Sequence, residues 1–277
     1  MRVNYHCHNR YSSDGRGTTD QLVARAVELG FEEICITNHV EVLGPDGDWH
    51  VDVVEARERF EQVAREIEAA RRRYPDRRIL LGAELEYRPE WVEPLEQLAA
   101  SVEFDFLVGS VHVVDGHNIS GGAGVGAYFE GKSLEEAYGR YFEVVAEMVE
   151  WGGFDVVGHF DLVKRFGTKV YGPYPVEPFE EMVRAILERM AARGIGLEVN
   201  TSGVVQPPAE PYPGLPILKL AREAGITTVT IGTDSHIPER FDQGWDAGLH
   251  LLREAGYETI TLFSRRVRRS APIAGAG

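Results

Sequence analysis

Residues 179–200 read FEEMVRAILERMAARGIGLEVN and join the two patterns that decide the fold. The first part, 179–193, is amphipathic and follows Pro178, a residue that is tolerated in the first turn of a helix. Gly194 then follows the helical pattern, as glycine commonly does at helix ends. The segment 194–200 is short and rich in apolar residues, which predicts a buried strand. This stretch therefore predicts a helix that leads directly into a strand.

The same alternation recurs about seven times along the chain. The predicted strands span 3–7, 34–37, 79–84, 104–112, 155–159, 194–200 and 228–233. The predicted helices span 19–29, 53–73, 91–101, 134–151, 179–193, 216–224 and 245–255. Strands separated by helices of this length pair in parallel through right-handed crossovers. Seven such units favour an α/β fold with a closed, TIM-like barrel over an open, doubly wound sheet.

No Pro/Ser-rich linker divides the chain, so we predict a single domain over residues 1–270. No glycine-rich dinucleotide or phosphate-loop motif occurs, which removes the usual support for an open sheet. A further strand is predicted at 260–263, and the tail 271–277 is predicted to be disordered.

The composition restricts the partners of the protein. The 277 residues are 43% hydrophobic and 26% charged, which is typical of a soluble globular protein. Lys and Arg number 29 against 44 Asp and Glu, and the net charge of −15 argues against nucleic acid and membrane surfaces as partners. No apolar run approaches the ~20 residues of a membrane span, and the N-terminus has no signal-peptide pattern. We therefore predict a cytoplasmic protein, with homo-oligomerisation left open.

A glycine-rich stretch, 113–133, is the longest irregular segment. Irregular loops of this length are uncommon unless they are functional, so it is either a lid over a site or a floppy surface insertion. Elsewhere, the two cysteines, Cys7 and Cys35, are too few for a disulfide framework.

Ionisable residues lie at the ends of six of the seven predicted strands. They are His6 and His8, His39, Glu84, His112, His159, and Asp234 with His236. In a parallel barrel the carboxyl ends of all strands meet at one rim, where active sites lie. Packing so many imidazoles and carboxylates together would cost several kcal/mol per unpaired charge unless a cation were present. The sequence therefore predicts a metal site, to which the sixth strand, ending at Asn200, adds no obvious ligand.

The alternation of side chains along a strand sharpens this prediction. Residues i and i+2 share a face, so His6 and His8 point together and Cys7 points the other way. Asp234 and His236 form a second pair of this kind. Neutral imidazoles at such spacing bind Zn, Mn or Fe well. We expect Cys7 to be a small buried hydrophobic residue and not a ligand.

The pattern of these histidines and carboxylates, in their order along the chain, resembles that of the PHP (polymerase and histidinol phosphatase) family of metal-dependent phosphoesterases. The resemblance rests on His6-x-His8, Asp14, His39, Glu84, His112, His159 and Asp234-x-His236, over nearly the whole chain. Segments 158–166, 197–203 and 232–236 are similar to the monofunctional histidinol-phosphate phosphatases. The family has a distorted seven-stranded (β/α) barrel, in agreement with the strand count above.

The resemblance implies two to three divalent transition-metal ions (Zn, Mn or Fe) in a trinuclear site. The ligand sets would be His6, His8, Glu84 and Asp234 for the first ion; Glu84, His112 and His159 for the second; and Asp14, His39 and His236 for the third. Some members have histidine where Asp14 stands here, and a carboxylate favours harder ions such as Mn or Fe.

The implied reaction converts L-histidinol phosphate and water to L-histidinol and phosphate, a step of histidine biosynthesis, with a metal-bridging hydroxide as nucleophile. The candidates for binding this phosphate ester are Arg165, Lys164, Arg10, Asn200 and Ser202. Asp161 is the candidate catalytic residue, as a general acid or by orienting a ligand, although it could equally cap a loop. Glu198, Asp161 and Tyr128 are candidates for contacting the cationic half of the substrate.

Three alternatives remain at this point. A related phosphoesterase acting on nucleotides or single-stranded DNA ends would keep all the ligands. An amidohydrolase barrel also opens with His-x-His, although Glu84 and the late Asp-x-His pair fit it less well. A metal-binding module that has lost catalysis is the third, and the complete set of nine ligand positions argues against it.

Overall fold

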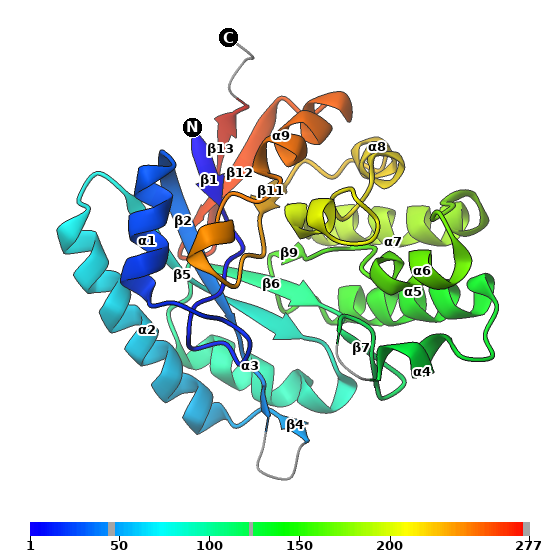
Figure 1. Ribbon diagram of the computed structural model, residues 1–277, viewed down its shortest axis with the longest axis horizontal. Coiled ribbons are helices and arrows are strands. Elements are labelled where there is room, and N and C mark those ends of the chain that lie inside the picture. The colour runs from blue at the N-terminus through cyan, green and yellow to red at the C-terminus, as the bar shows by residue number, and fades with distance from the viewer. Residues whose placement is uncertain (44–47, 122–123, 274–277) are drawn as a thin grey trace.

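The structure is a computed structural model that describes residues 1–43, 48–121 and 124–273, and its centre is a sheet of seven parallel strands (Figure 1). In spatial order the strands are β1 (Arg2–Asn4), β2 (Phe31–His39), β5 (Arg78–Glu86), β6 (Phe106–Ser110), β9 (Val156–Val157), β10 (Gly196–Asn200) and β11 (Val229–Gly232). All six neighbouring pairs are parallel. The predicted parallel topology is confirmed.

The two edges of this sheet meet, which closes the barrel. Tyr5 N donates to Ile231 O at 2.9 Å, and Asp234 N donates to His6 O at 2.8 Å. Farther along, His8 N donates to Ser235 O at 2.9 Å. The chain after β1 is therefore held against the chain after β11, and the residues that follow both strands come together at one rim.

Helices cover the outside of the barrel at all seven predicted positions (Figure 1). They are α1 (Thr19–Glu28), α2 (Val53–Arg73), α3 (Val92–Ser101), α5 (Leu134–Trp151), α7 (Glu180–Arg193), α8 (Leu215–Glu223) and α9 (Trp245–Glu254). Capping boxes at Thr18 and Ser133 start α1 and α5, and left-handed glycines end α5 and α7. Within the described ranges, no helix is both long and apolar enough to cross a bilayer.

Several short elements lie where the sequence pattern predicts loops. Two small hairpins are formed by β3 (Val42–Leu43) with β4 (Trp49–His50) and by β7 (Val113–Val114) with β8 (His117–Asn118). Two helices, α4 (Val125–Phe129) and α6 (Lys164–Tyr171), were not predicted either. The described residues of the segment 113–133 therefore contain a hairpin and a helix, with Tyr128 fully buried, so the segment is not irregular throughout as predicted. Its function as a lid stays a prediction, and its residues 122–123 lie outside the described ranges.

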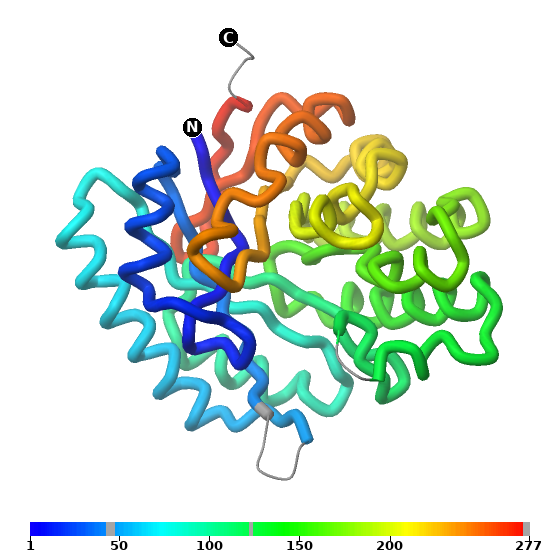
Figure 2. The backbone as a smooth tube through the Cα atoms, in the orientation of Figure 1, coloured from blue at the N-terminus to red at the C-terminus, as the bar shows by residue number. Residues whose placement is uncertain are grey.

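The last described residues of the chain form a hairpin. Strand β12 (Thr259–Ser264) pairs antiparallel with β13 (Val267–Pro272), beside the N-terminal strand (Figure 2). Phe263 N donates to Tyr5 Oη at 2.6 Å, which ties the hairpin to the barrel. The predicted strand at 260–263 is thus confirmed, but the predicted disordered tail begins too early, because Ala271 and Pro272 belong to β13. Residues 274–277 lie outside the described ranges.

Candidate metal centre

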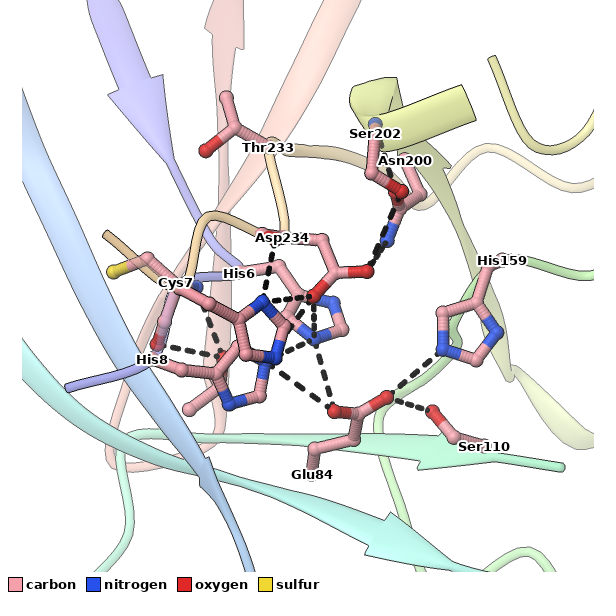
Figure 3. A network of polar contacts seen from close by, with 12 residues as sticks. His6, Cys7, His8, Glu84, Ser110, His159, Asn200, Ser202, Thr233 and Asp234 are labelled. Carbon is pink, nitrogen blue, oxygen red and sulfur yellow. Dashed lines mark hydrogen bonds and ion pairs between the residues drawn. The ribbon is translucent and has the colours of Figure 1, made fainter. Parts of the chain in front are cut away.

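All nine predicted ligands converge at the rim formed by the carboxyl ends of the strands. His39 and Glu84 belong to β2 and β5, while His6, His8, His112, His159, Asp234 and His236 follow β1, β6, β9 and β11, and Asp14 lies in the turn after β1. Figure 3 shows Glu84 at the centre, with His6, His8 and Asp234 on one side and His159 on the other. Cys7 is fully buried, as predicted for a residue facing away from this group.

The first donor group has the spacing of ligands around one ion. His6 Nε2 lies 3.1 Å from His8 Nε2 and 3.1 Å from Glu84 Oε2. His8 Nε2 lies 3.4 Å from Glu84 Oε2 and 3.3 Å from Asp234 Oδ1, and the His6–Asp234 separation is 3.7 Å. Four tetrahedral ligands at ~2.0–2.1 Å from a zinc ion lie about 3.3–3.4 Å from one another. The four side chains therefore fit a tetrahedral divalent ion.

Glu84 connects the first donor group to a second one through its other oxygen. Its Oε1 lies 2.9 Å from His159 Nε2 and 3.5 Å from His112 Nε2, and the two imidazole nitrogens are 3.1 Å apart. Glu84 is 1% exposed, and Ser110 Oγ donates to its Oε1 at 2.6 Å. One buried carboxylate thus presents one oxygen to each group, as a bridging ligand does.

The third donor group, Asp14, His39 and His236, is more open. Asp14 Oδ2 lies 3.1 Å from His236 Nε2, and its Oδ1 lies 3.8 Å from His39 Nε2. The Asp14 side chain is 58% exposed and that of His236 is 28% exposed. His39 and His236 also lie close enough to His8 for the three imidazoles to share an ion.

A layer of hydrogen bonds aims the imidazoles at this centre. His6 Nδ1 donates to Glu198 Oε1 at 2.7 Å, and His112 Nδ1 donates to Glu86 Oε2 at 2.7 Å. His8 Nδ1 lies 3.0 Å from Ser12 Oγ, which donates its own proton to Asn38 and so accepts from His8. Each contact leaves Nε2 free to bind an ion, as outer partners of metal-bound histidines do.

Glu198 and Glu86 are therefore functional residues that the sequence reasoning misjudged or missed. The sixth strand does contribute to the centre, because Glu198 fixes His6 and also accepts from His159 N at 3.0 Å. Buried between two histidines, it is not a contact for the cationic half of the substrate. The signal for Glu86 was available, since it lies at i+2 from Glu84 and so on the same face of β5.

The electrostatics of the centre call for added positive charge. Burial raises the pKa of Glu84, but the nearby imidazoles of His6, His39 and His112 lower it well below its ordinary value. Burial lowers the pKa of His112, yet Glu84 and Glu86 raise it to about 10. The pKa of Asp234 is likewise held low by His6 and His8 against the effect of burial. The carboxylates are thus ionised, and either protons or bound cations must balance them.

Two of the candidate ligands are among the described non-glycine residues with a positive φ. His159 has a φ of 23° and Asp234 a φ of 51°, in the region that non-glycine residues rarely adopt. Such strain costs about 1–3 kcal/mol per residue and clusters at functional sites. Hydrogen bonds from His159 N to Glu198 and from Asp234 N to His6 O hold these two backbone conformations.

A cleft opens above the centre, lined by candidate ligands and by residues of the neighbouring loops. The added lining includes Glu41, Trp49, Glu86, Arg88, Trp91, Val113, Asn118, Ser120, Leu162 and Arg165. Arg88 lies 4.1 Å above the Trp91 ring. Arg165 is the one predicted substrate-binding residue among these lining side chains.

The other predicted substrate-binding residues lie elsewhere. Asn200 Nδ2 and Ser202 Oγ both approach Asp234 Oδ2 at 3.4 Å, so they hold a candidate ligand in place (Figure 3). Arg10 pairs with Glu66 on the outside of the barrel and does not line the cleft. Tyr128 donates to Ala137 O at 2.6 Å, which occupies the hydroxyl that was a candidate for substrate contact.

Asp161 and Lys164 form a buried ion pair away from the cleft. Lys164 Nζ lies 2.9 Å from Asp161 Oδ2 and 2.8 Å from Glu210 Oε1, and both Asp161 and Lys164 are 0% exposed. Lys164 Nζ also donates to Pro211 O at 2.9 Å. Neither residue lines the cleft, so their positions do not support Asp161 as a general acid or Lys164 as a phosphate ligand. They instead join the start of α6, which carries Arg165, to the loop before α8.

Replacing Lys164 by methionine is expected to lower the free energy of unfolding by about 3–5 kcal/mol, because Asp161 would then be a buried, unpaired charge. Urea denaturation measures this change. Lys169→Met, one turn later and exposed, is the control and should shift stability by no more than about 0.5 kcal/mol. Adding Asp161→Asn to Lys164→Met should restore part of the loss. Equal stabilities of the two lysine variants would contradict a structural ion pair.

Comparison with known proteins agrees with this geometry. The family model described as "PHP domain" matches residues 4–202. A probable histidinol-phosphatase of Deinococcus radiodurans is 27% identical over 95% of the chain and 97% of its own length, and the histidinol-phosphatase of Lactococcus lactis is 26% identical over 95% and 94%.

A solved structure supports the fold assignment. The histidinol phosphate phosphatase of Lactococcus lactis, crystallised with Zn, L-histidinol and phosphate, superimposes with a TM-score of 0.82 and 24% identity over 97% of this chain and 98% of its own. It shares the barrel. Because the family model covers more than half of the 277 residues, the chain belongs to the PHP domain family.

Proposed function

We propose that the protein is a metal-dependent phosphate monoester hydrolase that converts L-histidinol phosphate and water to L-histidinol and phosphate. The observation that carries this proposal is the buried carboxylate of Glu84, which presents one oxygen to each of two histidine-rich donor groups. The names of the relatives from Deinococcus radiodurans and Lactococcus lactis support histidinol phosphate as the substrate. The reaction belongs to histidine biosynthesis.

The donor chemistry fits divalent transition-metal ions such as Zn, Mn or Fe. His6, His8, Glu84 and Asp234 would hold the first ion, Glu84, His112 and His159 the second, and Asp14, His39 and His236 the third. Imidazole and carboxylate donors suit these metals, and Glu84 Oε2 is buried without a hydrogen-bond partner among the described atoms. When bound, such ions supply Lewis acidity toward phosphoryl oxygens and make water a better nucleophile.

The remaining residues of the site orient the reactants. Glu198 and Glu86 keep His6 and His112 in the tautomer that presents Nε2, and Ser110 donates to Glu84. Arg165, at the first turn of α6, lines the cleft beside the donor groups. Its guanidinium can grip two phosphate oxygens with parallel, charge-assisted hydrogen bonds.

Replacing Arg165 by alanine is expected to lower kcat/KM for L-histidinol phosphate by ~10–100-fold, because a charge-assisted pair of hydrogen bonds to phosphate is lost. Steady-state kinetics at fixed metal concentration measure the effect. Arg10→Ala is the matched control, since Arg10 pairs with Glu66 outside the cleft, and it should stay within about twofold of the wild type. An unchanged kcat/KM for Arg165→Ala would remove Arg165 from the site.

The net charge of −15 supports a small-molecule ester over nucleic acid as the substrate. A cytoplasmic location fits the proposed biosynthetic reaction, and homo-oligomerisation stays an open prediction that sedimentation would test.

The proposed substrate is tested by assaying phosphate release from a panel with defined Zn, Mn or Fe. L-Histidinol phosphate should give a kcat/KM at least ~10²-fold above those for nucleoside monophosphates and single-stranded DNA ends. A preference for nucleotides would replace the substrate but keep the phosphoesterase chemistry. Amide cleavage without phosphate release would overturn the proposed reaction class.

A further inference from the structure

A second cleft reaches the candidate metal centre from another side. Its lining consists of Asp14, Arg165, Phe166, Lys169, Val205, Gln206, Pro207, Asp234, His236, Ile237, Arg240 and Gln243. Four of these residues, Asp14, Arg165, Asp234 and His236, also line the first cleft. Both clefts therefore reach the candidate ligands Asp14, Asp234 and His236, while their outer walls are formed by different residues.

The outer walls of the two clefts differ in charge. The first cleft carries Glu41 and Glu86 with Trp49 and Trp91, and Arg88 is its one cation besides Arg165 among the described lining residues. The second cleft carries Lys169 and Arg240 in addition to Arg165, and its described acids are Asp14 and Asp234, both candidate metal ligands. In a chain with a net charge of −15, this second opening gathers cations.

The three cations of the second cleft converge from two elements. Arg165 and Lys169 lie four residues apart on α6, so they share one face of the helix. Arg240 comes from the short 3-10 turn η4 (Pro238–Arg240) that follows β11. Among the described residues, none of the three forms an ion pair with a carboxylate, and Arg165 and Lys169 both lie over the Phe166 ring, 5.5 Å and 5.1 Å from its centroid. Their charge is thus available to a ligand and not spent on an internal ion pair.

Unpaired cations along a cleft attract anions and raise their local concentration. We propose that the second cleft is a binding path for phosphate dianions, in which Lys169 and Arg240 attract the phosphoryl group before it reaches the donor groups and Arg165. The anion is either the phosphoryl end of an arriving ester or the inorganic phosphate that leaves. This inference rests on the proposed phosphatase function, because it assigns the approach of the same phosphate group.

The test compares a double variant, Lys169→Gln with Arg240→Gln, with the matched control Lys219→Gln with Arg72→Gln. All four side chains are exposed, and the control pair lies on α8 and α2, outside both clefts. Each double variant removes one lysine and one arginine charge, so the change in net charge is identical. Circular dichroism before and after heating checks that both variants stay folded.

Two measurements distinguish the sources of the anion. The first is kcat/KM for L-histidinol phosphate as ionic strength rises from ~0.02 to ~0.5 M, which shortens the screening length and weakens attraction across the cleft. The second is the binding of inorganic phosphate to the metal-loaded protein by isothermal titration calorimetry. We expect kcat/KM of the cleft variant to fall about tenfold at low salt and about twofold or less at high salt. The control should follow the wild type.

Each outcome decides the proposal. A salt-dependent loss in kcat/KM assigns the cleft to the arriving ester, and weaker phosphate binding alone assigns it to the leaving product. Equal behaviour of the two double variants in both measurements would overturn the proposal. If the wild type releases no phosphate from any ester, the proposed function fails, and the calorimetric comparison still tests the cleft by itself.

Discussion

Replacing Glu84 by glutamine is expected to lower kcat at least ~10³-fold, while the fold is retained. Glu84 is the one described carboxylate with a separate oxygen directed at each of two histidine groups, 3.1 Å from His6 Nε2 and 2.9 Å from His159 Nε2. An amide has the same shape, but it offers only one acceptor oxygen and no charge, so one of the two ions would lose its oxygen ligand and both would lose the balancing negative charge. Steady-state kinetics with saturating L-histidinol phosphate measure the loss.

The control for this experiment is Glu90→Gln, an exposed residue in the 3-10 turn η1 (Pro89–Trp91), which should leave kcat within about twofold. Glu86→Gln is an informative intermediate case, because Glu86 holds His112 but does not bridge the groups. Loss of such a supporting contact typically costs about 10–100-fold. A Glu84→Gln enzyme with near wild-type kcat would show that the bridge has no part in catalysis.

Removing divalent ions with a chelator is expected to abolish turnover and to lower the melting temperature. Turnover should return when Zn, Mn or Fe is added back, because the donor groups around Glu84 would again hold the cations that balance their charge. The ionised carboxylates and the raised pKa of His112, about 10, indicate that protons replace the ions in the metal-free protein. Calorimetric melting curves with and without chelator measure the stability change.

Turnover that survives exhaustive chelation would contradict metal-dependent chemistry. A melting temperature that is insensitive to chelation would mean that the donor groups bind no ion that stabilises the folded protein. Addition of Mg²⁺ is a useful comparison, since imidazole ligands suit transition metals better than Mg²⁺. Restoration by Mg²⁺ alone would contradict the predicted class of ion.

Much of the fold followed from periodicity and end signals. The helix predictions for α2 and α5 match the structure at both ends, because Asp52 and Ser133 cap their starts and Tyr74 and Gly152 follow their ends. Strand limits were less accurate: β9 is only Val156–Val157, since the chain turns sharply at His159. The periodicity of apolar residues indicates which face of a strand is buried. The number of residues that pair depends on the neighbouring strands, which the sequence does not reveal.

The candidate ligands were predictable because the rule about strand ends converts position in sequence into position in space. The supporting residues were harder to predict, because Glu198 and His6 are 192 positions apart in the sequence and come together only when the barrel closes. Arg10 and Lys164 show the opposite error. They are near ligands in sequence, but Arg10 turns outward to Glu66 and Lys164 turns inward to Asp161. Charge type alone does not reveal which way a loop side chain points.

The most direct test of the metal centre is to measure the metal content of freshly purified protein by inductively coupled plasma mass spectrometry. The protein must not have been exposed to a chelator. Nine converging candidate ligands, with Glu84 between two groups, predict about two to three transition-metal ions per chain. Fewer than about two ions per chain, under conditions in which the enzyme turns over L-histidinol phosphate, would contradict the multinuclear centre.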